Sequence, residues 1–208
     1  MKVLMINGSA HENGCTATAL REMAQVLAGE EIESEIVCLG GDPVRDCTGC
    51  GACSKLNGHC VHNDDMVNAL IDKARTCDGF VFGSPVYYAH PSGRLLSVLD
   101  RMFYAASDVF RGKVSAAVAS ARRAGTTATL DVINKYFGIS GMPVAGSTYW
   151  GMVHGGCAED VKKDTEGLQT MRNLARNMAY MMKSAALAKE NGLNAPDMEH
   201  GNRTNFIR

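Results

Sequence analysis

The first eighteen residues constrain the fold of this chain more than any other stretch. Residues 3–6 are consecutively apolar, which is typical of a strand buried on both faces. The polar turn Asn7-Gly8-Ser9 follows, and a helix is predicted to begin between Asn13 and Thr16. A strand, a loop of small residues and a helix N-terminus form a phosphate-binding geometry, because the loop offers N–H groups and hydroxyls and the helix dipole adds roughly +0.5 charge.

Two common phosphate-binding motifs are absent from this stretch. No Gly-x-Gly-x-x-Gly follows the strand, so a dinucleotide fingerprint is not supported, and no Gly-Lys-Ser/Thr marks a Walker loop. A loop rich in hydroxyl groups instead suits the phosphate of flavin mononucleotide (FMN), which flavodoxin-like proteins bind beside the first strand. The alternative is a serine-rich loop that only caps the helix.

Strands and helices alternate along the rest of the chain. Further strands are predicted at 33–39, 79–83, 114–119 and 144–148, and further helices at about 64–74, 95–103, 130–137 and 165–189. Glu33 and Glu35 favour an edge position for the second strand. The pattern predicts an α/β, flavodoxin-like fold: a doubly wound five-stranded parallel sheet in the order 2-1-3-4-5, with a C-terminal helix and tail.

Polar loops follow the first, third and fourth predicted strands. The second of these loops covers residues 84–91 and the third covers residues 120–127. Ligands of open parallel sheets bind beyond the carboxyl ends of the strands, so the three loops are expected to meet at one rim. Three polar loops at one rim strengthen the hypothesis that the chain binds FMN.

A cluster of four cysteines, Cys47, Cys50, Cys53 and Cys60, lies in a Gly/Cys-rich insertion at residues 40–62. Three thiolates two residues apart can surround one iron–sulfur cluster, and a fourth can complete a 4Fe-4S site. Gly49 and Gly51 allow the backbone to turn tightly between them. Zinc more typically takes two separated Cys-x-x-Cys pairs. Free loop thiols, or a disulfide between two of them, remain the alternatives.

Three groups of residues resemble the NADPH-dependent FMN reductase family, and within it the iron–sulfur flavoproteins. They are Asn7-Gly8-Ser9 with Asn13-Gly14 and Thr16, then residues 83–87, then the cysteine cluster followed by Asp64-Asp65-Met66. The resemblance extends from Met1 to about Lys189. The implied FMN contacts are, at the phosphate, Ser9, His11, Asn13, Cys15 and Thr16; along the ribityl chain and ring, Pro85, Val86, Tyr87 and Tyr88; at the polar ring edge, Ser120, Ala121, Arg122 and Gly125; and, with no part of the cofactor assigned to it, Ser84.

The first loop departs from the family pattern. The family often has Pro and Arg after the serine and Asn before the threonine, where this chain has Ala10, His11 and Cys15. The missing arginine removes a fixed positive charge from the implied phosphate site, which lowers the expected affinity for FMN.

Composition limits the classes of partner. The 208 residues carry 21 basic and 22 acidic side chains, a net charge of −1, so no nucleic acid partner is indicated. No signal-like segment opens the chain and no apolar run is long enough for a membrane span, so a cytoplasmic protein without membrane contact is expected. Residues 1–190 are predicted to form the FMN-binding domain, and residues 191–208 a polar tail.

The leading functional hypothesis is an FMN oxidoreductase that takes hydride from NADH or NADPH. It would pass electrons to a small molecule such as a quinone, a nitro- or azo-aromatic compound or free flavin, and no side chain need be catalytic because the flavin carries the chemistry. A second hypothesis is an iron–sulfur flavoprotein that relays electrons between ferredoxin and FMN, and a third is a zinc-stabilised interaction module. The family resemblance implies a homodimer or homotetramer.

Overall fold

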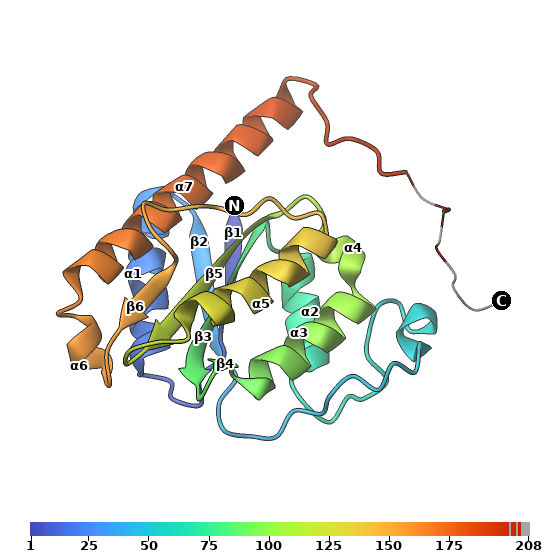
Figure 1. Cartoon of the computed structure of the whole chain (residues 1–208). Helices are drawn as coiled ribbons and strands as arrows, with labels where there is room; N and C mark the ends of the chain where they lie inside the picture. The colour runs from blue at the N-terminus through green and yellow to red at the C-terminus, as the bar shows by residue number, and fades with distance from the viewer. Residues whose placement is uncertain (200, 203, 205–208) are drawn as a thin grey trace.

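The computed structural model describes residues 1–199, 201–202 and 204, and its centre is a parallel sheet with the predicted flavodoxin-like order (Figure 1). The strands follow one another across this sheet in the order β2-β1-β3-β5-β6. A short extra strand, β4, pairs antiparallel with the end of β3. The bounds are β1 (Lys2–Asn7), β2 (Glu33–Cys38), β3 (Gly79–Tyr87), β4 (His90–Pro91), β5 (Val114–Ala121) and β6 (Met152–His154).

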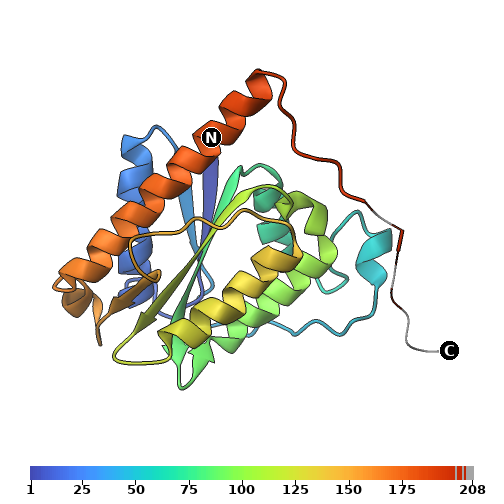
Figure 2. The ribbon, with the colours of Figure 1, turned by 45° about the horizontal axis from the view of Figure 1, so that its top comes forward.

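Helices cover both faces of the sheet (Figures 1 and 2). One apolar core lies beneath α2, α3, α4 and α5, and a second lies beneath α1, α6 and α7. The methionine stripe of the last helix belongs to this second core, as Met171, Met178 and Met182 show. The bounds are α1 (Cys15–Gly29), α2 (Val67–Arg75), α3 (Gly93–Ala105), α4 (Ser107–Phe110), α5 (Thr126–Ile139), α6 (Ala158–Val161) and α7 (Thr165–Glu190).

Strand β1 is buried on both faces, as its apolar run predicts. Leu4 and Ile6 point into the core under α2 and α3, whereas Val3 and Met5 point into the core under α1 and α7. Strand β2 is at the edge of the sheet, and its Glu35 forms ion pairs with Lys2 and Lys73. The two glutamates therefore predicted its position correctly.

The last strand lies further along the chain than the sequence predicts. In place of a strand at 144–148, Val144 makes a single bridge to Ser115, and β6 pairs Met152 with Ala119. Four positions separate Ser115 from Ala119 but eight separate their partners, so four extra residues bulge out of the sheet. The chain returns at Gly151, where a Cβ atom would lie 2.5 Å from the Ala117 carbonyl oxygen.

The Cys-rich insertion contains one short 3₁₀ helix, η1 (Ala52–Lys55), among residues 40–62. Figure 1 places this segment beside α3, on the side of the molecule away from β6 and α6. Residues 191–199 are exposed and outside helices and strands, while residues 200, 203 and 205–208 of the predicted tail lie outside the described residues. Among the described helices, none is long and apolar enough to cross a membrane.

Candidate functional site

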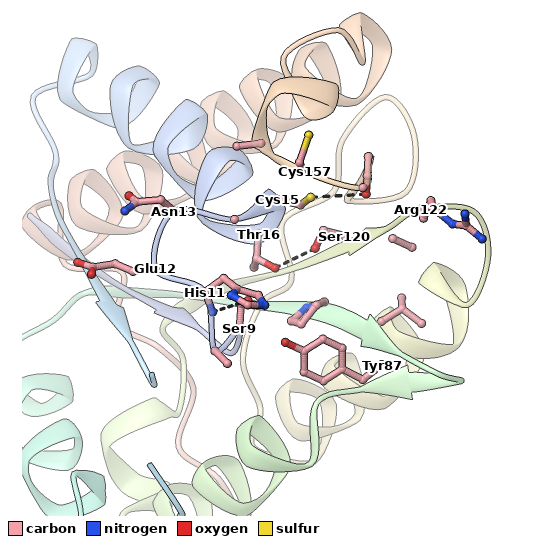
Figure 3. A pocket seen from close by; sticks show the side chains of 18 of the residues that line it. Ser9, His11, Glu12, Asn13, Cys15, Thr16, Tyr87, Ser120, Arg122 and Cys157 are labelled. Carbon is pink, nitrogen blue, oxygen red and sulfur yellow. Dashed lines mark hydrogen bonds between the residues drawn. The ribbon is translucent and has the colours of Figure 1, made fainter. Parts of the chain in front are cut away.

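A cleft of about 820 Å³ lies at the rim where β1, β3 and β5 end (Figure 3). The three polar loops predicted to meet do so here, with residues from each lining the same cavity. The predicted site residues that line it are Ser9, His11, Asn13, Cys15, Thr16, Pro85, Val86, Tyr87, Ser120, Ala121 and Arg122.

The loop between β1 and α1 is held by its own hydrogen bonds. The Ser9 N–H donates to Asn7 Oδ1 at 3.1 Å, and the His11 N–H donates to Ser9 Oγ at 3.0 Å. Helix α1 begins after Gly14, and no side chain caps its N-terminus. Its first N–H groups therefore lack a side-chain acceptor, which is the arrangement that attracts an anion. The serine of this loop caps its own turn rather than the helix.

A buried hydroxyl pair joins α1 to β5 at the floor of the cleft. The oxygens of Thr16 and Ser120 are 2.8 Å apart. Beside them, the Cys15 thiol donates to the Gly155 carbonyl oxygen at 3.5 Å. Burial raises the pKa of Cys15, and the neighbouring Cys157 raises it further, so Cys15 is a protonated donor at neutral pH. These contacts fix the first turn of α1 against β5 and against the loop after β6.

The sequence analysis missed one wall of the cleft. Gly155, Gly156, Cys157, Ala158 and Glu159 line it, from the loop after β6 into α6. Asp160 holds this loop by accepting from the Gly156 N–H at 3.0 Å, which lowers the pKa of the Asp160 carboxyl. The small residues that follow β6 could have indicated this wall, but the sequence predicts the strand eight residues too early, at 144–148.

Three predicted site residues do not line the cleft. Ser84 is fully buried, and its hydroxyl donates to the Pro85 carbonyl and accepts from the Ser92 N–H. Tyr88 is fully exposed at the β3–β4 turn, with a φ of 64°. Gly125 precedes α5 with a φ of 90°, and a Cβ there would lie 2.7 Å from Val86 Cγ1. Their contact with a flavin stays a prediction.

The four clustered cysteines line one pocket together with Arg101 and Tyr104. Gly49 and Gly51 have φ values of 63° and 71°, which gives the backbone between the thiols the tight turns expected of it. The Ala52 N–H and the Thr48 hydroxyl lower the pKa of Cys50, which favours the thiolate. None of the eight cysteines, all within the described residues, forms a disulfide. Within the described part of the chain, no three His, Cys, Asp or Glu side chains form a metal-holding group.

Comparisons with known proteins agree with this geometry. The model of the NADPH-dependent FMN reductases matches residues 1–156. An iron–sulfur flavoprotein of Methanocaldococcus jannaschii is 35% identical over 191 residues, covering 88% of this chain and 98% of the relative. Another, of Methanosarcina thermophila, is 28% identical over 188 residues, covering 88% and 96%.

The solved structure of a flavodoxin from the domain Archaea has the same fold, with a TM-score of 0.59, 14% identity and coverage of 88% of this chain and 99% of that one. The family match extends over the three rim loops and the cysteine cluster. The chain belongs to the NADPH-dependent FMN reductase family and, within it, to the iron–sulfur flavoprotein subgroup.

Proposed function

We propose that this protein is an FMN oxidoreductase that takes hydride from NADH or NADPH and passes electrons to a small-molecule acceptor. The observation that carries the proposal is the cleft itself, where the uncapped N-terminus of α1 meets the hydroxyls of Ser9, Thr16 and Ser120. A phosphate placed there would receive backbone N–H groups and hydroxyl donors without an arginine. The volume of about 820 Å³ is within the usual range for a cofactor site.

The residues around the cleft suggest separate roles in holding FMN. Ser9, Thr16 and the first turn of α1 would bind the phosphate, and Pro85 to Tyr87 would pack along the ribityl chain and ring. Arg122 would place its cation at the polar ring edge. FMN supplies the hydride and electron transfer chemistry when bound, so these residues bind and orient it.

The four-cysteine pocket favours a second redox centre. Four thiols from one short segment line the same pocket, and the donor set suits a 4Fe-4S cluster held by Cys47, Cys50, Cys53 and Cys60. The curated relatives above are named iron–sulfur flavoproteins. With a cluster, this protein would exchange single electrons with a carrier protein such as ferredoxin. A zinc-stabilised module is the non-redox alternative for the same thiols.

Spectra of anaerobically purified protein distinguish these functions. Flavin bands alone support the oxidoreductase, additional broad absorption that dithionite bleaches supports the cluster, and a colourless zinc protein contradicts both. Stopped-flow mixing with NADPH and with NADH then measures hydride uptake. If neither nucleotide reduces the bound flavin but reduced ferredoxin does, the carrier function replaces the nicotinamide-dependent one.

A pair of cysteine variants assigns the iron to the proposed pocket. Cys50→Ser removes an exposed thiol of the pocket, and Cys157→Ser removes a thiol that is also exposed, in the proposed FMN cleft. Iron and sulfide content should fall in Cys50→Ser and stay at the wild-type level in Cys157→Ser. Light scattering on the same preparations measures the oligomeric state, for which a homodimer or homotetramer is expected.

A further inference from the structure

The cysteine pocket is built over a completely buried arginine. The side chain of Arg101, on α3, has no exposed surface, and its guanidinium forms an ion pair with Asp65, whose side chain is 8% exposed. A fully buried arginine is rare, because its charge must be paired and its N–H groups must find hydrogen-bond acceptors. The ion pair with Asp65 compensates the positive charge of Arg101. The other N–H groups of the guanidinium are free to donate to the cysteine segment.

Those donors contact both ends of the cysteine segment. Nη1 donates to the Arg45 carbonyl oxygen at 3.2 Å, two residues before Cys47, and Nη2 donates to the His62 carbonyl oxygen at 2.8 Å, two residues after Cys60. One rigid, planar group thus joins the start of the loop to its end. Helix α3 is a fixed support for that group, since Val98, Leu99 and Met102 are fully buried.

The same guanidinium also contacts one of the thiols. Nε donates to Cys60 Sγ at 3.2 Å. An arginine guanidinium keeps its proton in proteins, so the donor to this sulfur is a cation. A cationic donor to a ligand sulfur stabilises the more negative, reduced form of an iron–sulfur site and therefore raises its reduction potential.

We propose that Arg101 is a positioning residue for the iron–sulfur site: it holds the two ends of the cysteine loop together and, through Cys60, raises the reduction potential of the cluster. The inference rests on the proposed cluster. One-electron reduction adds a single negative charge at this site without breaking a bond, and the Arg101 cation lies against the sulfur where part of that charge develops.

Two variants separate this role from a general contribution to folding. Arg101→Lys keeps the cation for Asp65 but removes the planar fork and the Nε donor. The double variant R101M/D65L replaces the buried ion pair with apolar groups of similar size, a change that usually preserves folding. The matched controls are Arg45→Lys and R45M/D64L, because Arg45 and Asp64 form the adjacent ion pair with side chains 62% and 56% exposed.

Potentiometric titration of anaerobically reconstituted protein, followed by electron paramagnetic resonance, measures the cluster potential. Both Arg101 variants should show a more negative midpoint and faster iron loss to a chelator than wild type, with the larger change in R101M/D65L. Both Arg45 controls should match wild type. The flavin midpoint of each sample serves as an internal reference and should not move. Equal potentials and iron loss in all five proteins would overturn the proposed role.

A measurement on the apoprotein separates failure of this inference from failure of the proposed cluster. Lys55 is exposed in η1, so trypsin cleavage there reports on how firmly the loop is held. Cleavage after Lys55 should be faster in both Arg101 variants than in the Arg45 controls. If wild type takes up no cluster, the proposed cluster and the effect on its potential are refuted, while the cleavage rates still decide whether Arg101 holds the loop.

Discussion

At the scale of single residues, Thr16 contributes to the cleft through both its backbone N–H and its side chain. It lies in the first turn of α1, its backbone N–H is among those without a capping side chain, and its hydroxyl pairs with that of Ser120. Both residues are at most 3% exposed. Loss of the Thr16 hydroxyl therefore removes a donor from the proposed phosphate site and leaves the Ser120 hydroxyl unpaired.

Thr16→Val should weaken FMN binding about tenfold, since a hydrogen bond to a charged phosphate contributes roughly 1.5–3 kcal/mol. Quenching of flavin fluorescence during titration of the apoprotein measures the dissociation constant. Thr18→Val is the matched control, because the Thr18 hydroxyl donates to the carbonyl oxygen of Gly14, the residue before α1, and Thr18 does not line the cleft. Equal dissociation constants for the two variants would contradict the placement of the phosphate.

The ion pairs of Glu35 predict that part of the folding stability depends on pH. The Lys73 ammonium, and after it that of Lys2, lowers the pKa of the Glu35 carboxyl below its ordinary value of 4.5. A lowered folded-state pKa contributes stability above pH 4.5 that is lost as the pH falls through the lowered value. Glu35→Gln should therefore cost up to about 1 kcal/mol at pH 7 and less at pH 4, below the ordinary pKa of 4.5. Urea unfolding at both pH values measures this, with the more exposed Glu33→Gln as the control.

The first β–α unit could be predicted almost completely from its sequence, because a buried strand and an amphipathic helix both leave periodic patterns. The end of the sheet could not, since β6 has only three residues and a bulge of four residues precedes it. Such a short strand has no periodicity of its own, and its place is set by pairing with Ala119 and by Gly151. The wall formed by Gly155 to Glu159 was missed for the same reason.

At the scale of elements, alanine substitutions at Gly8 and Gly29 are expected to change the free energy of unfolding in opposite directions. A Cβ at Gly8 would lie 2.9 Å from the Gly83 carbonyl oxygen and 2.9 Å from Leu95 Cβ, where β1 passes into the first loop. Gly8→Ala should destabilise the protein by about 1–3 kcal/mol, because neither neighbour can move freely. Gly29, the last residue of α1, has open space, so Gly29→Ala should stabilise by up to about 1 kcal/mol. Urea unfolding of the apoprotein compares both, and a tolerated Gly8→Ala would refute the close approach.

Across the whole molecule, α3 connects the two candidate redox sites. Ser92 caps its N-terminus by accepting from the Leu95 N–H, and the Ser92 hydroxyl donates to the Gly8 carbonyl oxygen of the FMN loop at 2.7 Å. Arg101 and Tyr104, near its other end, line the cysteine pocket. From Gly93 to Tyr104 the helix rises about 16 Å, at 1.5 Å per residue. The sites are therefore joined by one rigid element and do not share side chains.

This separation predicts that the two sites bind their groups independently. Changes more than about 10 Å apart without shared partners usually add within about 0.5 kcal/mol, which is roughly twofold in a dissociation constant. Cys50→Ser should thus leave FMN affinity within about twofold of wild type, and Thr16→Val should leave iron content unchanged. The double variant should show both losses, each as large as in its single variant, by flavin titration and iron analysis. A loss of FMN affinity in Cys50→Ser well beyond twofold would instead mean that α3 transmits a structural change from the cysteine loop to Gly8.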